Sequence, residues 1–403
     1  NYYKYDQEWK KFEISRAKLK VKLNNGLVVP LRKKILWSEY GPVLKNDSGV
    51  FSFHLSALEN ISAIEQWYQM NKANNFEDFK RALNIMGIPR FNIIYADKQD
   101  NIFYMSNGLI PLRDTNYNWK LTIPGNSSKT KSNGYYGFKD LPKLENPISG
   151  YIFNTNNSPF NCTEKSNNLK EENFPKSFGY REKFNNRSLR FEKLIDSYDK
   201  INYEDFLKIK YDQEYANPIF CPFKINKIFD VTFNDSCEVA DILSVIQSWD
   251  RKANVDNIGA AQFSMFYKSL RKKLKKINFD FDREIPDSLL LESLQKTKNH
   301  ILRSFDKLNI SLGEYQKHVR ADVEIPIGGL VDMIAESSSS KYKDGKVKVV
   351  KGDSYIMLVK FGDDLPEIET VLPYGISNSV KSPNFTNQMN KYESQKRKKM
   401  TLD

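Results

Sequence analysis

The chain contains the stretch Asn154-Thr155-Asn156-Asn157-Ser158-Pro159, a run of residues that favour turns. This stretch lies near the end of residues 108–162, a segment in which turn-forming residues dominate. The segment is therefore predicted to form long, ordered loops over a scaffold. Loops held in this way often carry binding or catalytic residues.

Strands and hairpins are predicted on the N-terminal side of these loops. Residues 17–23 alternate apolar and lysine side chains, and Asn24-Asn25-Gly26 follows them, which predicts a half-buried hairpin. Residues 91–105 predict a second hairpin with a polar turn at 97–100. The N-terminal third of the chain therefore has the pattern of a sheet.

Two helices are predicted between these hairpins. Apolar residues at helical spacing predict the first over residues 61–68. The second carries apolar residues between 76 and 83, with Asn75 as its cap and with Gly87 and Pro89 ending it. These helices interrupt a region that otherwise favours strands.

The pattern becomes helical from about residue 189 and returns to strands near the C-terminus. Residues 235–238 resemble a capping box, and the apolar side chains that follow lie on one helical face: Val239, Ile242, Leu243, Ile246 and Trp249. The run of four serines at 337–340 predicts a short linker or loop tip. The strands expected after it are residues 347–350, 354–361 and 368–372.

Composition indicates a globular protein. Of the 403 residues, 40% are hydrophobic and 13% aromatic, which is too much packing material for a disordered chain. No apolar run approaches the 18 or so residues that cross a bilayer, so no membrane span is predicted. Three cysteines without a close pair and three histidines support neither a zinc site nor a disulfide framework.

The net charge of +12 raises the possibility of a nucleic-acid partner. The densest basic clusters, residues 271–276 and 396–399, contain no aromatic side chains that could stack on bases. We interpret them as a solvated helix face and a basic tail, and the charge as a bias of composition. Nucleic acid is therefore not predicted as a partner.

Three stretches, in this order, resemble the penicillin acylase family. The first contains residues 91–97, 101–104 and 110–113, similar to the family's central hairpin and the loop after it. The second runs from Leu141-Pro142 to Ser158-Pro159 and includes the paired asparagines. The third contains Gly352-Asp353-Ser354-Tyr355, Leu372-Pro373-Tyr374-Gly375 and residues 382–388. The order and spacing of these pieces, which span nearly the whole chain, carry the resemblance.

The resemblance implies an α+β fold, the four-layer αββα sandwich of the N-terminal nucleophile hydrolases. It divides the chain into residues 1–165, part of the sandwich with the site loops; residues 166–310, a mainly helical insertion; and residues 311–403, strands that return to the core. The implied reaction is hydrolysis of an acyl amide by a serine at an exposed chain start, whose own α-amino group acts as the base. Since Asn1 cannot be that nucleophile, the chain is expected to be the C-terminal part of the larger chain.

The resemblance also implies roles for four residues. Asn156 corresponds to the asparagine whose amide donates to the tetrahedral oxyanion, although the paired asparagines could merely close a turn. Asn157 and Phe91 are expected to contact substrate, and a core position is the alternative for Phe91. Arg190 is expected to organise the polar network of the site, with Arg187 as a rival for that role.

The family also implies calcium as a structural metal, with Glu164 and nearby acidic residues as candidate ligands, and no organic cofactor. The expected partners are a small acyl amide and the smaller chain of the same processed precursor, in the periplasm or outside the cell. Two alternatives remain open: a non-catalytic or truncated binding protein on the same fold and, among enzymes, an acylase of acyl-homoserine lactones.

Overall fold

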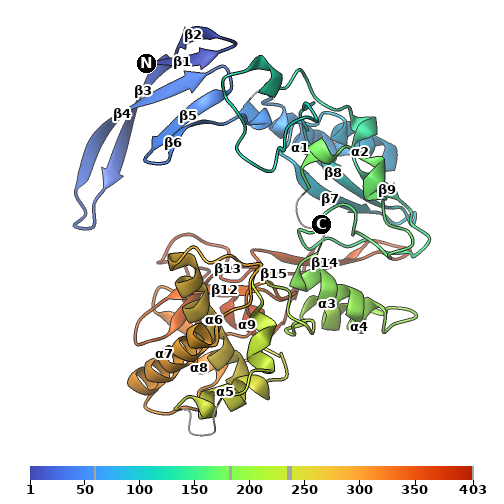
Figure 1. Ribbon diagram of the computed structural model, residues 1–403. Helices are drawn as coiled ribbons and strands as arrows, with labels where there is room; N and C mark the ends of the chain where they lie inside the picture. Colours follow the sequence, from blue (N-terminus) through green and yellow to red (C-terminus); the bar gives the residue numbers. More distant parts are fainter. Residues whose placement is uncertain (59, 181–183, 234–237, 402–403) are drawn as a thin grey trace. The chain divides into compact units, whose positions relative to one another are not determined.

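The computed structural model describes residues 1–58, 60–180, 184–233 and 238–401. The chain forms two compact units, Asn1–Lys183 and Phe184–Asp403. We call them the N-terminal and C-terminal units, and Figure 1 traces the chain through each of them. The predicted division at residues 165 and 310 stays a prediction.

The N-terminal unit begins with two antiparallel sheets. β1 pairs with β2, and the four strands that follow pair in sequence order. Their bounds are β1 (Tyr2–Tyr5), β2 (Glu8–Lys11), β3 (Glu13–Lys22), β4 (Val28–Ser38), β5 (Gly41–Asn46) and β6 (Gly49–Ser52). Within each of these sheets a strand therefore lies beside the one that follows it along the chain, as expected where short turns join antiparallel strands.

The predicted first hairpin forms, but it is not half-buried. β3 and β4 pair with Leu19 opposite Leu31, and Gly26 adopts a φ of 84° in the turn between them. Leu19 and Val21 are 44% and 37% exposed. β3 is an edge strand, and the part of its unit that the structure describes leaves these apolar side chains accessible, so the expected burial is wrong.

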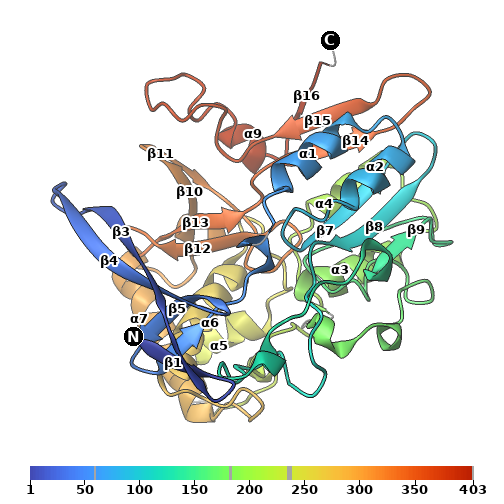
Figure 2. The same cartoon turned by 90° about the horizontal axis from the view of Figure 1, so that it is seen from above.

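A third sheet, of order β7-β8-β9, forms the core of the N-terminal unit together with two helices. Asn75 caps α2 by accepting a hydrogen bond from the backbone NH of Asp78, as predicted. Phe76 and Leu83 of α2 pack with Phe103 of β8 in one buried cluster, and Figure 2 shows α1 and α2 lying beside β7. The bounds are η1 (Ser56–Leu58), α1 (Ala63–Lys72), α2 (Phe76–Leu83), β7 (Phe91–Ala96), β8 (Ile102–Asn107) and β9 (Lys143–Glu145).

The segment from residue 108 onward forms ordered loops, as the turn residues predict. Short 3₁₀ turns punctuate it: η2 (Ser128–Thr130), η3 (Phe138–Asp140), η4 (Glu171–Asn173) and η5 (Lys176–Phe178). Ile110, Leu141 and Phe178 from these loops are buried in the same cluster as Phe103. The loops are therefore anchored by apolar side chains.

Helices form most of the first half of the C-terminal unit. α5, α6 and α7 pack around one large apolar cluster, and the predicted face of α5 is buried in it. Residues 235–237 of the predicted capping box lie outside the described residues. The bounds are α3 (Asn186–Ile195), α4 (Tyr203–Lys210), η6 (Ile225–Phe229), α5 (Ala240–Gln247), α6 (Ile258–Lys276), α7 (Asp287–Phe305) and α8 (Leu312–Tyr315).

The predicted C-terminal strands form, and they belong to two sheets. One has the order β11-β10-β13-β12, with β10 and β13 parallel, and the other has the order β14-β15-β16. The bounds are β10 (Gln316–Arg320), β11 (Val323–Pro326), β12 (Ser337–Lys341), β13 (Val347–Gly352), β14 (Ile356–Lys360), β15 (Glu367–Val371), α9 (Met389–Glu393) and β16 (Lys398–Lys399).

The serine run is a strand, so the linker expected at residues 337–340 is wrong. β12 pairs along its whole length with β13, and the hydroxyls of Ser338 and Ser339 donate hydrogen bonds to Glu336 and Gln316. Pairing with a neighbouring strand thus outweighs the weak strand preference of serine.

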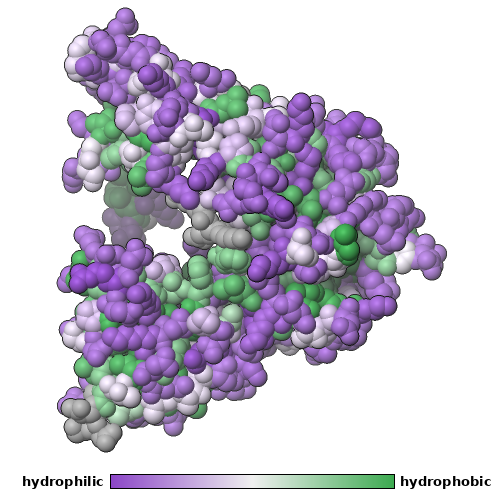
Figure 3. Space-filling model, turned by 45° about the vertical axis from the view of Figure 1, so that its right-hand side comes forward, coloured by the Kyte–Doolittle hydropathy of each residue, from purple (hydrophilic) through white to green (hydrophobic). Residues whose placement is uncertain are grey.

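On the face drawn in Figure 3, most residues are hydrophilic and the apolar residues form separate areas. None of the helices in the described ranges has the length and apolar character needed to cross a bilayer.

Candidate active site

A chain of amide hydrogen bonds joins β7 to the paired-asparagine loop. The hydroxyl of Tyr104 donates to Oδ1 of Asn92 at 2.6 Å, and Nδ2 of Asn92 donates to Oδ1 of Asn154 at 3.3 Å. Oδ1 of Asn154 also accepts a bond from the backbone NH of Asn156 at 3.0 Å. Because Tyr104 is fully buried in β8, the loop is tied to the sheet of its unit.

Asn156 lies at the exposed turn of this loop. Its φ of 67° is in the left-handed region, which asparagine tolerates better than most residues do. The residue is exposed, while residues 157–160 after it are buried. The loop therefore fixes the backbone of Asn156 and keeps the residue at the surface of the unit.

Asn157 is buried within the loop and holds it closed. Its Oδ1 accepts bonds from the backbone NH of Thr155 at 2.7 Å and from the Thr155 hydroxyl at 3.0 Å. Its Nδ2 donates to the carbonyl of Asn161. These bonds show how Asn157 closes the turn, and its expected contact with substrate stays a prediction.

Phe91 lies at the start of β7, one residue before Asn92 of the hydrogen-bond chain. It pairs with Asn107 of β8, and its side chain is 51% exposed, so the ring is only partly packed. The structure thus brings Phe91 into the same part of the N-terminal unit as Asn156 and Asn157.

Arg190 lies in the C-terminal unit and clamps two carboxylates. From α3 its Nε and Nη2 donate to both oxygens of Asp212 at 3.0 and 2.8 Å, and its Nη1 and Nη2 donate to both oxygens of Glu214 at 3.1 and 3.0 Å. Arg190 is 9% exposed. Burial lowers the pKa of its guanidinium, but the bonds to Asp212 and the charges of both carboxylates raise that pKa above its ordinary value.

Arg187, the rival for this role, has a different partner. Its Nε donates to Oδ1 of Asp332 at 2.9 Å, and the backbone NH of Asn186 donates to Oδ2 of the same carboxylate at 2.9 Å. The Arg187 pair is more exposed than the clamp on Asp212 and Glu214. Of the two arginines, Arg190 is therefore the one at the centre of a buried polar network.

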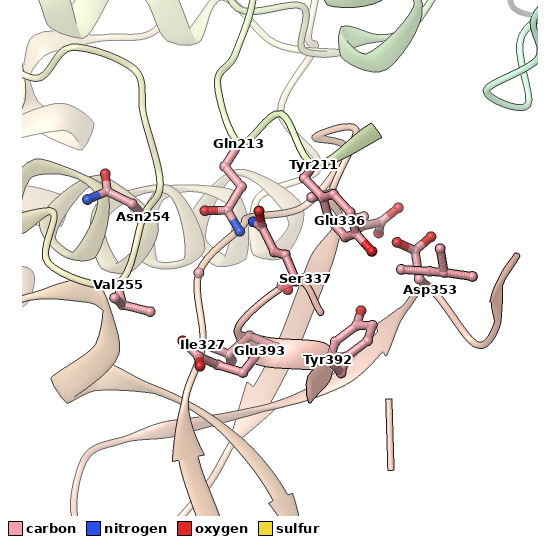
Figure 4. A pocket seen from close by; sticks show the side chains of 14 residues that line it. Tyr211, Gln213, Asn254, Val255, Ile327, Glu336, Ser337, Asp353, Tyr392 and Glu393 are labelled. Atoms are coloured by element: carbon pink, nitrogen blue, oxygen red, sulfur yellow. The ribbon is translucent and has the colours of Figure 1, made fainter. Parts of the chain in front are cut away.

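A cavity of about 200 Å³ adjoins the segment that Arg190 holds. Gln213, between the two clamped carboxylates, is one of its lining residues. Figure 4 shows Asn254 and Val255 on one side of the cavity and Asp353 and Tyr392 on the other. Its remaining lining residues are Tyr211, Ile327, Gly328, Ala335, Glu336, Ser337, Ile356, Glu393 and Gln395.

The sequence did not identify four members of these networks: Asn92, Asn154, Asp212 and Glu214. Asn92 could have been identified from the sequence, because it is the one amide side chain in the otherwise apolar run of β7. Asp212 and Glu214 could not, because they lie more than twenty residues from Arg190 along the chain and only the fold brings them together.

The two described cysteines are unsuited to nucleophilic catalysis. Burial raises the pKa of the Cys162 thiol to about 12 and also raises the pKa of the Cys221 thiol, so both are protonated at neutral pH. Cys237 lies outside the described residues.

The described residues contain no group of three or more His, Cys, Asp or Glu side chains placed to hold a metal ion. Glu164, the candidate calcium ligand, is exposed. Calcium takes six to eight oxygen ligands, which include backbone and amide carbonyls as well as carboxylates, and the expected calcium ion stays a prediction.

Comparison with known proteins finds one family and several relatives. The family described as penicillin amidase matches residues 1–403. The acyl-homoserine lactone acylase PvdQ of Pseudomonas fluorescens (strain Pf0-1) is 21% identical over 90% of this chain and 52% of its own length. The penicillin G acylase of Escherichia coli is 28% identical over 39% of this chain and 18% of its own length.

A solved structure of similar fold is the thermostable penicillin G acylase from Alcaligenes faecalis. The likeness covers 100% of this chain and 80% of that chain, with a TM-score of 0.62 and 16% identity. This confirms the predicted α+β class, the fold of the N-terminal nucleophile hydrolases. The chain spans about half the length of the curated relatives it matches.

Proposed function

The chain belongs to the penicillin amidase family, and from that membership we propose that the protein hydrolyses the amide bond between an acyl group and an amine. The observation that carries the proposal is the match of the family over residues 1–403. Relatives named as acylases support it, since one of them aligns with 90% of the chain.

The proposed reaction begins with a serine hydroxyl that lies outside these 403 residues. Its oxygen attacks the amide carbonyl while its proton passes to the serine's own α-amino group, and a tetrahedral oxyanion forms. When the C–N bond breaks, the amine leaves with that proton and the acyl group stays on the serine as an ester. Water then attacks the ester and releases the carboxylic acid.

Asn156 is the proposed side-chain donor to the oxyanion. A neutral N–H held in place stabilises developing negative charge without reorganising during the reaction. The hydrogen bonds of Asn154 and Asn157 support this role, because they fix the loop on both sides of Asn156. Asn157 is also proposed to line the substrate site at its buried edge.

Arg190 is proposed as a positioning residue. It fixes Asp212 and Glu214, and Gln213 between them lines the cavity of the C-terminal unit. A guanidinium holds two carboxylates at once through fork-shaped contacts, which a lysine cannot reproduce. Loss of the Arg190 side chain would therefore remove the bonds that hold the segment from Asp212 to Glu214 in place.

Phe91 is proposed to contact the acyl group. Its half-exposed ring offers apolar surface one residue away from the asparagine chain. The acyl group that suits such a ring is apolar.

An acyl-homoserine lactone is the favoured substrate within this class. Relatives named as acyl-homoserine lactone acylases align with 90% or more of the chain, whereas the relative named penicillin G acylase aligns with 39%.

The proposal extends to a precursor that cuts itself into a smaller and a larger chain, to a location in the periplasm or outside the cell, and to a calcium ion bound by residues other than those described.

The test uses the full-length protein. A serine-directed acylating reagent should label one serine, and a panel of long-chain acyl-homoserine lactones, phenylacetyl amides and β-lactams should show hydrolysis of an amide bond. Labelling without any turnover would favour the alternative of a binding protein on the same fold. A protein that neither reacts nor hydrolyses any of these compounds would overturn the proposal.

A further inference from the structure

A second, larger cavity lies in the C-terminal unit between α6, β12 and β13. Its volume is about 690 Å³. One helix, two strands and the loop before β12 form its wall. α6 supplies Phe263, Lys268, Arg271, Lys272 and Lys275. The loop supplies Leu330 and Val331, and the strands supply Ser338, Ser339, Val350 and Lys351. We call this space the α6 cavity.

Positive charge dominates the wall of the α6 cavity. Lys268, Arg271, Lys272, Lys275 and Lys351 line it against a single carboxylate, Glu336. Each of the four cations of α6 lies three residues from one of the others and four residues from another, so they share one side of the helix. Like charges at these spacings repel one another and destabilise a helix.

Within the described ranges, none of these five cations forms an ion pair with a carboxylate. The contrast is Lys273 on the same helix, which pairs with Glu292 of α7. Glu336 accepts a hydrogen bond from the Ser338 hydroxyl at 2.7 Å. The positive charge of the cavity is therefore not neutralised by the residues that the structure describes.

Lys268 is the innermost of these cations. Its Nζ donates to the Ser339 hydroxyl at 2.8 Å, and Ser339 in turn donates to Oε1 of Gln316 at 2.9 Å. The other end of the Gln316 amide donates to the Gly329 carbonyl at 2.8 Å, which fixes the orientation of the amide. Ser339 therefore has to accept from Lys268, and the ring of Tyr315, with its centroid 5.4 Å from Nζ, is the other group that faces the ammonium.

Two physical consequences follow for Lys268. Burial without a carboxylate lowers the pKa of this amine to about 8, so a bound anion would stabilise its charged form. Its position, eight residues before the last residue of α6, is too far from the helix end for the helix dipole to explain a cation there. A ligand with negative charge would supply the anionic partner that the Lys268 ammonium lacks.

Apolar surface lies next to this charge. Phe263 and Leu330 are buried in the cavity wall, while Val331 and Val350 at its edge are 40% and 52% exposed. A free inorganic ion would leave these valines in water, whereas a ligand with an apolar part would cover them.

We propose that the α6 cavity binds an anionic amphiphile, a small molecule that carries a carboxylate or a phosphate beside an apolar chain. The anionic group bonds to Lys268 and Lys272, and the chain covers Val331 and Val350. The α6 cavity shares Glu336 and Ser337 with the smaller cavity that Gln213 lines, and the inference does not depend on amide hydrolysis.

Calorimetric titration of the full-length protein tests the inference with four probes: octanoate, octyl phosphate, inorganic phosphate and octyl glucoside. At least one of the two amphiphilic anions should bind with 1:1 stoichiometry and about tenfold more tightly than both inorganic phosphate and the uncharged glucoside. The tighter of the two anions identifies the headgroup. The inference is wrong if neither anion binds, or if either control probe binds as tightly.

Variants locate the binding. Lys268→Met removes a charge-assisted bond and should weaken the preferred anion about tenfold to a hundredfold, while Lys272→Gln should weaken it about twofold to fivefold. Lys276→Gln, on the same helix but outside the lining of the cavity, is the matched control and should leave the affinity unchanged.

If Lys268→Met does not fold, as circular dichroism would show, the exposed pair Arg271→Gln and Lys272→Gln replaces it, with an expected loss of at least fivefold. Unchanged affinity in the folded cavity variants would overturn the assignment.

Discussion

Asn92 and Asn154 are joined by a side-chain hydrogen bond of 3.3 Å, although they are 62 residues apart in the sequence. This bond links the strand that begins at Phe91 to the loop that presents Asn156. The proposed acyl contact and the proposed oxyanion donor thus share one support. Asn154→Ala should remove that support, because it deletes the acceptor of both Asn92 and the Asn156 backbone NH.

In the full-length enzyme we expect Asn154→Ala to lower kcat by about tenfold to a hundredfold and the free energy of unfolding by about 1 kcal/mol. Steady-state kinetics and urea unfolding give the two numbers. The control is Asn118→Ala, which deletes another side chain that accepts a backbone bond, from Lys120, in an exposed turn. Equal kcat losses in both variants would contradict the assigned role of Asn154.

Asn156 permits a sharper test because of its positive φ. Asn156→Gly deletes the side chain without straining a backbone at φ 67°, so the melting temperature should hardly change. If the amide donates to the oxyanion, kcat should fall by about 10² to 10³. Asn156→Asp, which keeps the shape but removes the N–H donors, should lose at least as much. A fall of less than threefold in both variants would exclude the oxyanion role.

Phe91→Ala is expected to change substrate preference more than stability. Since the ring is half-exposed, truncation should cost about 1 kcal/mol of folding free energy or less, well below the cost at a core phenylalanine. KM for long acyl chains should rise about tenfold while KM for acetyl substrates changes little. A loss of 3 kcal/mol with unaltered chain-length preference would instead identify Phe91 as a core residue.

Arg190→Met should destabilise the C-terminal unit. It leaves Asp212 and Glu214 with uncompensated negative charge in a largely buried setting, at a cost of about 3 to 5 kcal/mol. Adding Asp212→Asn and Glu214→Gln should recover at least half of that loss, as measured by urea unfolding. Arg187→Met, at the more exposed pair, should cost less. If Arg190→Met lowered the free energy of unfolding by less than about 1 kcal/mol, the bonds of Arg190 to the two carboxylates would not be important for stability.

The buried setting of His318 leads us to expect that stability depends on pH. Its Nε2 donates to the Pro373 carbonyl and its ring stacks on Tyr374 at 4.5 Å, while its buried Nδ1 has no hydrogen-bond partner among the described residues. Burial lowers the pKa of His318, partly opposed by the bond to Pro373. The unfolded chain therefore binds this proton at a higher pH than the folded chain does.

It follows that acidification below the ordinary histidine pKa of about 6.5 should cost stability until the lowered folded pKa is reached. The loss approaches about 1.4 kcal/mol per pH unit within that window. His318→Gln keeps a donor for Pro373 and removes the titration, so its melting temperature should fall less between pH 7.5 and 5.5. Parallel curves for the two proteins would contradict this account.

The sequence predicted features that neighbouring residues determine. The cap at Asn75, the turn at Gly26 and the apolar face of α5 each depend on spacing within a few residues. The exposure of Leu19 could not be predicted in this way, because burial depends on what the rest of the fold places over a strand.

Partners distant in sequence account for the other differences. Serine favours turns when taken alone, and only pairing with β13 and the hydroxyl bonds to Gln316 and Lys268 explain a strand at residues 337–340. In the candidate site, the resemblance selected Asn156 and Arg190, but the groups that hold them, Asn154 and Asp212, were visible only in three dimensions.

The accessible edge strand β3 also bears on how the protein avoids aggregation. An edge strand with exposed apolar side chains is a template on which another chain can add as a further strand. Here Lys18, Lys20 and Lys22 alternate with Leu19 and Val21, so two copies that approached edge to edge would bring rows of like charge together. These three lysines are therefore expected to disfavour the addition of a second copy along β3.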